Sequence, residues 1–162
     1  MTAEEQILRV QTTVQNLLRE IERLPADVLY REPRAGEWPV MSTLAHLQEF
    51  LAYWAYEADA VARSPGKAFG RTMEDPKRLG AIAEHGHDSL SAIVPRIRAA
   101  LDECVAMLRG IPADGWRNVG THPTRGSFTA ERIVGSFIVE HAEEHALQTQ
   151  ATLETLRTPQ LP

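Results

Sequence analysis

Two histidines stand four residues apart in an apolar stretch near the end of the chain, at positions 141 and 145. On a helix, His141 and His145 would lie one above the other on the same face. Val134, Phe137 and Ile138 fall on that face too when each residue turns the helix by about 100°. A buried imidazole without a partner costs roughly 1–3 kcal/mol, and a metal ion is the partner that best suits two stacked imidazoles. We therefore expect His141 and His145 to be metal ligands.

A third ligand is required, and His46 in the apolar segment 44–47 is the natural candidate. His46 falls at the flank of its own helical stripe, so it must reach the pair across a groove. Three neutral imidazoles suit zinc, nickel, iron or copper and leave one position for water or substrate. The charge of the ion would lower the pKa of a bound water or thiol and produce a nucleophile near neutral pH. On residue types alone, histidines satisfied by hydrogen bonds inside a helical core remain an equal alternative.

The residues around the pair add a candidate base and a candidate partner. His141, Glu144 and His145 match the H-x-x-E-H pattern of inverted zinc peptidases, but those enzymes need an acidic ligand well downstream, and the chain ends at residue 162. Glu144 is therefore considered as a catalytic base or an orienting partner of a ligand histidine, against an ordinary solvated glutamate. Gln148 extends the histidine face by one turn and either hydrogen-bonds near the metal or closes the polar end of the cavity.

Further candidates could form a pocket beside the histidines. Trp38, Tyr53 and Trp54 either line such a pocket or belong to the helical core. His122 and Arg125 stand in the connection before the last helix, where they could reach an anionic substrate or simply face solvent.

The elements that must position these residues are four long helices. Apolar residues recur at helical spacing in four segments, with turn-forming connections at 64–87 and 110–128 and a short helix at 76–84 in the first connection. No strand-like alternation competes with this pattern. The predicted class is all-α, a four-helix bundle whose long connections permit crossovers. The four helices run from Thr2 to before Pro25, from after Trp38 through Val61, from Asp88 to Arg109, and from Thr129 to Arg157.

Local signals fix some of these boundaries. Thr2 and Glu5 have capping-box spacing, Pro39 suits a first helical turn, and Asp88 is a suitable N-cap. Pro95 should either kink the third helix in its first turns or shift its start to a later residue.

Composition bounds the class of protein. The chain has 162 residues, of which 43% are hydrophobic and 24% charged, which is typical of one soluble globular domain over 1–162. A net charge of −5 argues against nucleic-acid binding. No signal peptide and no apolar run of membrane-spanning length is present, so we expect a cytoplasmic protein without a membrane partner. The single cysteine, Cys104, excludes an internal disulfide and is expected to be a reduced core residue.

These motifs together resemble the DinB-like, or YfiT-like, metalloenzyme superfamily. The resemblance runs from about residue 5 to residue 157, and Pro39 departs from it where relatives often have a serine or threonine cap. It depends on four short motifs in a particular order: Gly36-Glu37-Trp38-Pro39-Val40, Leu44-Ala45-His46-Leu47, His122-Pro123 with Gly126, and His141-x-x-x-His145-x-x-Gln148.

The resemblance implies a homodimeric four-helix bundle with a divalent metal, zinc or nickel, held by His46, His141 and His145. Relatives include S-transferases that use bacillithiol or mycothiol and a mycothiol-dependent maleylpyruvate isomerase. The expected partners are thus a small thiol and an electrophilic substrate. Two alternatives stay open: a non-catalytic metal- or ligand-binding stress-response dimer, and a structural dimer whose histidines are satisfied by hydrogen bonds.

Overall fold

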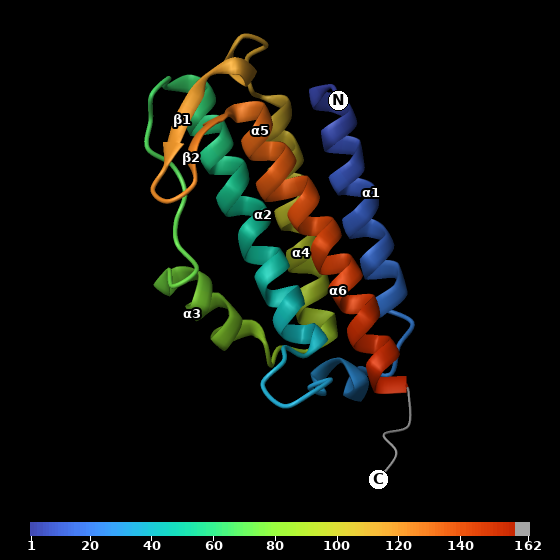
Figure 1. Ribbon diagram of the computed structural model, residues 1–162. Helices are drawn as coiled ribbons and strands as arrows, with labels where there is room; N and C mark the ends of the chain where they lie inside the picture. The colour runs from blue at the N-terminus through green and yellow to red at the C-terminus, as the bar shows by residue number, and fades with distance from the viewer. Residues whose placement is uncertain (158–162) are drawn as a thin grey trace.

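The computed structural model describes residues 1–157, so residues 158–162 of the expected domain lie outside it. Its long elements are four helices, the last of which is continuous from α5 through a π-helical turn into α6; α2 and α4 run in one direction, and α1 and α6 run in the opposite one (Figure 1). The class predicted from the sequence, an all-α four-helix bundle, is confirmed. In chain order the elements are α1 Ala3–Ile21, a 3-10 turn Ala26–Tyr30, α2 Val40–Arg63, α3 Pro76–His85, α4 Leu90–Arg109, a 3-10 turn Gly115–Arg117, β1 Val119–His122, β2 Gly126–Thr129, α5 Ala130–Val134, the π-helical turn Gly135–Val139 and α6 Glu140–Arg157.

The ends of α1 and α2 follow from their capping residues. The Thr2 hydroxyl accepts from the Glu5 backbone N–H at 3.2 Å, and the Glu5 carboxylate accepts from the Thr2 N–H at 2.6 Å. This confirms the predicted capping box, which satisfies backbone donors that the first helical turn leaves free. The helix ends at Ile21, earlier than the expected stop before Pro25. Pro39 is the N-cap of α2, one position before the first turn where it was expected.

The start of α4 also differs from the expected one. Its N-cap is Ser89, whose hydroxyl accepts from the Ala92 N–H at 3.2 Å, and Asp88 lies one residue outside. Pro95 lies inside the helix, so it does not shift the start to a later residue. Asp88 instead accepts hydrogen bonds from His85 and Arg96, which explains why it does not cap the helix.

The core lies between the four rods, with α2 in contact with α4, α3, α5 and α6. All seven predicted residues of the α2 stripe are at most 6% exposed. Cys104 is fully buried and has a free thiol, as expected for a core residue. The stripe of α2 consists of Val40, Leu44, Leu47, Leu51, Trp54, Ala58 and Val61.

A β-hairpin that the sequence analysis did not predict precedes α5. β1 and β2 pair antiparallel, with Val119 opposite Thr129 and His122 opposite Gly126. Each strand has only four residues, which is too short for the alternation of apolar and polar residues to be recognised. The expectation that no strand occurs was therefore wrong for residues 119–129.

The hairpin holds the first part of the connection between α2 and α3, residues 64–75, which we call the crossing segment. The Phe69 N–H donates to the Thr121 carbonyl at 3.1 Å, and the Gly70 N–H donates to Glu57 of α2 at 2.6 Å. The ring of His122 packs directly against Gly70, which has φ +87°. The crossing segment is thereby held against the hairpin and α2, and it runs from the upper end of α2 down to α3 (Figure 1).

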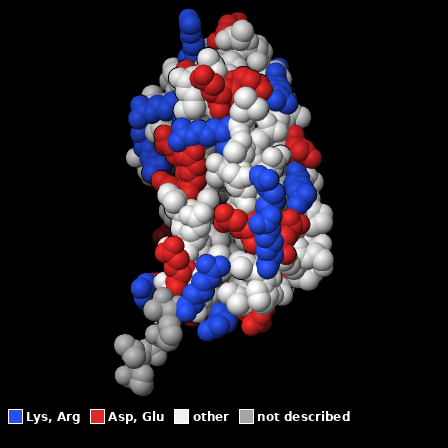
Figure 2. All heavy atoms as spheres, turned by 90° about the vertical axis from the view of Figure 1, so that its right-hand side faces the viewer, with Lys and Arg blue, Asp and Glu red and all other residues white. Residues whose placement is uncertain are grey.

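The outer face over α1 carries basic and acidic side chains side by side (Figure 2). Ion pairs link α1 to its neighbours, but solvent screens such exposed pairs, so they contribute little to stability. The pairs are Arg9 with Glu143 of α6, Glu22 with Arg98 of α4, and Glu4 with Arg109 of α4.

None of the helices in residues 1–157 is long and apolar enough to cross a membrane.

We predict that Gly70→Ala destabilises the fold more than Gly66→Ala does. Both glycines have positive φ, so an alanine costs about 1–2 kcal/mol of backbone strain at either position. Only at Gly70 would the new Cβ also meet another side chain, at 2.3 Å from the His122 ring, which adds about 1–3 kcal/mol of overpacking. Urea unfolding of the two variants measures the difference, and equal destabilisation would contradict the packing of His122 against the crossing segment.

Candidate metal centre

The three predicted histidines come together in the bundle, His46 from α2 and the other two from α6. Each offers one ring nitrogen, and the three nitrogens lie within 4.8 Å of one another. The ring centroids of His141 and His145 are 4.6 Å apart, and His46 lies 5.3 and 5.0 Å from them. His46 thus reaches the pair across the groove between α2 and α6, as its position at the flank of its stripe requires.

The histidines have fewer hydrogen bonds than their burial demands. His46 is 1% exposed, yet neither of its ring nitrogens has a hydrogen-bond partner among the described residues. The Nε2 of His145 is buried and without a partner in the same part of the chain. Buried polar atoms are almost always satisfied, so three such nitrogens in one cluster require a ligand. This geometry fits a divalent metal ion, and hydrogen bonds between the described residues do not satisfy these three nitrogens.

Two further contacts orient the rings on α6. The Nδ1 of His145 donates to the Gln148 side-chain oxygen at 2.9 Å, because that oxygen can only accept. This bond leaves the lone pair of Nε2 directed at the cluster, the usual arrangement for a metal-ligating histidine. Phe50 stacks on the ring of His141 at a centroid distance of 4.4 Å. Gln148 thus hydrogen-bonds the His145 ring and also lines a cavity beside it.

Electrostatics keep the cluster neutral near pH 7. Burial, followed by the neighbouring His145, lowers the pKa of His46 from 6.5 to about 2. Burial also lowers the pKa of His141 from 6.5 to about 4 and the pKa of His145 in the same direction. A neutral imidazole has the free lone pair that a metal needs, so burial prepares all three rings as ligands.

The π-helical turn before α6 changes which residues face the core. Beyond it, the buried positions of α6 are mostly small or polar, and His141 is only half-buried. A straight helix would carry the apolar stripe of residues 133–139 on through His141 and His145, and this was the prediction. The stripe instead changes at the π-helical turn. A π turn inserts an extra residue into the helix and is frequent at functional sites. The buried residues of α6 are Ala142, His145, Thr149, Thr152 and Leu153.

Two cavities meet at the cluster. The larger, about 720 Å³, is lined by His46 and His141, and the smaller, about 560 Å³, by His145. Met73 and Arg78 line both cavities and so lie between them.

The other predicted site residues are distributed unevenly around these cavities. Arg125 and Glu144 line the larger cavity, and Trp38 and Gln148 line the smaller one. Tyr53 lines neither cavity. The Arg71 guanidinium lies over the Tyr53 ring, with its central carbon 3.9 Å from the ring centroid.

His122 and Trp54 belong to the wall of the larger cavity. His122 is 5% exposed, so it is not a solvated loop residue. Its Nδ1 accepts from the Thr124 N–H at 3.2 Å, and its ring stacks on Phe137. These contacts make it a packing residue that holds the hairpin against the crossing segment and the helix.

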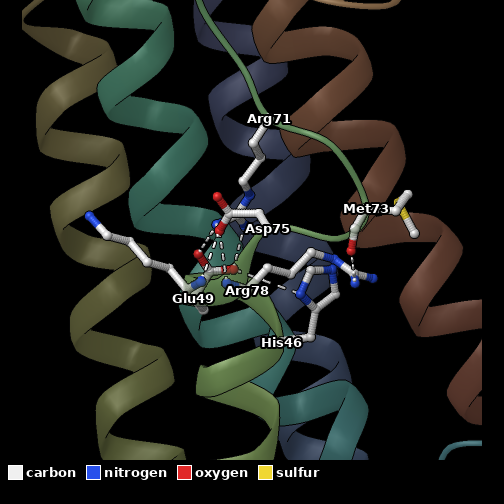
Figure 3. A network of polar contacts seen from close by, with 7 residues as sticks. His46, Glu49, Arg71, Met73, Asp75 and Arg78 are labelled. Atoms are coloured by element: carbon white, nitrogen blue, oxygen red, sulfur yellow. Dashed lines mark hydrogen bonds and ion pairs between the residues drawn. The ribbon is translucent and has the colours of Figure 1, made fainter.

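A polar network that was not predicted from the sequence lies beside His46 (Figure 3). Arg71 donates to both carboxylate oxygens of Glu49 at 2.6 Å and to Asp75 at 3.4 Å. Glu49 lies 3.8 Å from the Nδ1 of His46, beyond hydrogen-bond distance, and the low pKa of His46 excludes an ion pair near neutral pH. Arg78 extends toward His46 and donates to the Met73 carbonyl at 3.0 Å. Most of these residues come from a connection without periodicity, so no pattern in the sequence marks them.

The sequence profile of the DinB superfamily matches residues 9–149, and the chain belongs to this superfamily. The resemblance inferred from the histidine motifs is thereby confirmed. No curated protein matches the chain at the level of sequence.

Solved structures share the fold. YfiT from Bacillus subtilis, described as a probable metal-dependent hydrolase with an unusual four-helix bundle topology, matches with a TM-score of 0.79 at 17% identity, covering 94% of this chain and 86% of YfiT. A mycothiol-dependent maleylpyruvate isomerase matches with a TM-score of 0.70 at 13% identity, covering 91% of this chain. The match spans only 60% of that isomerase. TT2238, a four-helix bundle protein, matches with a TM-score of 0.59 at 19% identity, covering 93% of this chain and 99% of TT2238.

We predict that the metal-free protein loses stability as the pH falls below 6.5. The folded-state pKa values of His46 and His141 lie below the unfolded value of 6.5, so the unfolded chain binds more protons in this range. Each histidine then lowers the free energy of unfolding by up to about 1.4 kcal/mol per pH unit. Urea unfolding between pH 7.5 and 5 measures how steeply the free energy of unfolding changes with pH. His46→Leu should reduce this slope by up to about 1.4 kcal/mol per pH unit, which is the contribution of one proton. A slope that is the same in His46→Leu would contradict the burial of a neutral His46.

Proposed function

We propose that this protein is a divalent-metal-dependent S-transferase that uses a small thiol of the mycothiol or bacillithiol class. The observation that carries the proposal is the cluster of His46, His141 and His145, in which His46 and His145 have buried nitrogens without a partner among the described residues, at the edge of a cavity of about 720 Å³. Three neutral protein ligands leave room for a further group, the arrangement of catalytic metal sites.

The chain supplies the ligands, their orientation and an enclosed volume for the substrates. The metal, when bound, would lower the pKa of a thiol so that it reacts as the thiolate. Gln148 holds the His145 ring through its Nδ1, and the ring of Phe50 supports His141. Glu144 is exposed at the wall of the larger cavity, where its carboxylate can accept the proton that the thiol loses. The thiolate sulfur then forms a bond to the electrophilic carbon while the leaving group departs with its electron pair.

Two findings support a thiol as the co-substrate rather than water alone. The cavity is large enough for more than a water molecule, and a mycothiol-dependent isomerase shares the fold. Zinc or nickel is proposed as the metal because neutral imidazole suits both. Cytoplasmic location and a homodimeric state are proposed from the sequence and the family, respectively.

The proposal predicts that metal content and thiol transfer are lost together. The wild-type protein should bind about one zinc or nickel ion per chain, measured by elemental analysis, and should accelerate the reaction of mycothiol or bacillithiol with 1-chloro-2,4-dinitrobenzene. Each of His46→Ala, His141→Ala and His145→Ala should sharply reduce both readouts, because each removes a ligand. The matched control is His87→Ala, since His87 is exposed and lies outside the cluster.

Two outcomes would contradict the proposal in different ways. Unchanged metal content in His145→Ala would exclude the three-histidine site itself. Full metal content without any thiol-dependent consumption of the electrophile would exclude the transferase and leave the non-catalytic metal-binding alternative.

A further inference from the structure

The larger cavity has arginines in its wall that form no ion pair with a carboxylate of the described residues. Its wall includes four arginines and two glutamates, Glu140 and Glu144, both of which are exposed on α6. The arginines are Arg71, Arg78, Arg125 and Arg132.

Of these arginines, Arg71 is already neutralised. Its side chain is 7% exposed and forms ion pairs with Glu49 at 2.6 Å and Asp75 at 3.4 Å. Both oxygens of Glu49 accept from Arg71, and no hydrogen bond joins Glu49 to Arg78 in the described range. Arg71 therefore has a structural role: it fastens the crossing segment to α2.

Arg78, in contrast to Arg71, has no carboxylate as an ion-pair partner among the described residues. It is half-buried, its donation to the Met73 carbonyl is to a neutral group, and within residues 1–157 it takes part in no ion pair. Burial, followed by repulsion from Arg71, lowers its pKa. A desolvated guanidinium without a carboxylate is costly, because buried charges are normally paired. Its planar set of N–H donors matches the two oxygens of a carboxylate.

The position of Arg78 places such a carboxylate beside the histidines. Arg78 lies in α3 between the two cavities, and its side chain extends toward His46 (Figure 3). Arg125 lines the larger cavity as well, with its guanidinium 5.2 Å from the centre of the Phe137 ring, and takes part in no ion pair in the described range. A metal held by neutral imidazoles would add further positive charge that the cluster does not compensate.

We propose that the larger cavity binds the carboxylate of a small organic molecule, with Arg78 as its main partner and Arg125 as a second. The inference rests on the proposed function in one respect, since it assigns the carboxylate to the thiol or to the electrophile that the site would join. It gives the substrate a chemical class that the histidines alone do not specify.

The test is calorimetric titration of the full-length protein with succinate and with its uncharged analogue succinamide. Titrations are made after chelation of metal, so that only the arginines hold the carboxylate, and again after loading with zinc. Wild type should bind succinate at least about tenfold more tightly than succinamide, because charge-assisted hydrogen bonds form only to the carboxylate. Arg78→Met should remove this preference in both states.

Arg23→Met is the matched control, because it changes the net charge equally at an exposed residue outside the cavity. It should bind succinate as the wild type does. The unfolding midpoint of Arg78→Met should equal or exceed that of the wild type, since a half-buried unpaired charge has been removed. Unchanged succinate affinity in Arg78→Met, or no preference of the wild type for succinate over succinamide, would overturn the proposal.

The titration is independent of the thiol-transfer assay, so the two proposals fail separately. Loss of succinate binding in Arg78→Met without any transferase activity would support the carboxylate site and reject only the reaction. Competition in the zinc-loaded protein with the neutral thiol 2-mercaptoethanol identifies the source of the carboxylate. Succinate that binds together with this thiol represents the electrophile, whereas succinate that excludes it represents a carboxylate on the natural thiol.

Discussion

The structure of the site depends on one unfavourable arrangement: imidazoles buried at the contact between α2 and α6 without enough hydrogen bonds to satisfy them. His46 has none at either ring nitrogen among residues 1–157, although it is 1% exposed. Leucine at this position would pack without that cost, as its neighbours Leu44 and Leu47 do. A site for a metal ion gives the arrangement a physical reason, and the same burial keeps the rings neutral so that they can bind one.

The crossing segment and the hairpin complete the site from outside the bundle. His122 packs against Gly70 and Phe137, so the hairpin, the crossing segment and the last helix are held together. Arg71 then fastens the crossing segment to Glu49, one turn along α2 from His46. This chain of contacts brings Arg78 to the cluster and separates two cavities that meet at the histidines.

How far the sequence predicted this structure depends on the range of each signal. The stripe of α2, the capping box at Thr2 and the short helix α3 follow from local spacing, and all were predicted. The meeting of His46 with the α6 pair was inferred because unpaired imidazoles in apolar stripes need a partner. The hairpin, the π-helical turn and the roles of Arg71 and Arg78 were missed, because they depend on tertiary contacts and not on local spacing.

The central claim is that three histidines hold a metal with one position open to a thiol, and X-ray absorption spectroscopy of the zinc-loaded protein tests it most directly. The account predicts a shell of nitrogen and oxygen ligands at about 2.0–2.1 Å, with the scattering pattern of three imidazoles. Adding the thiol should introduce one sulfur at about 2.3 Å while the three imidazoles remain. A spectrum without imidazoles, or one in which the thiol adds no sulfur, would contradict the account.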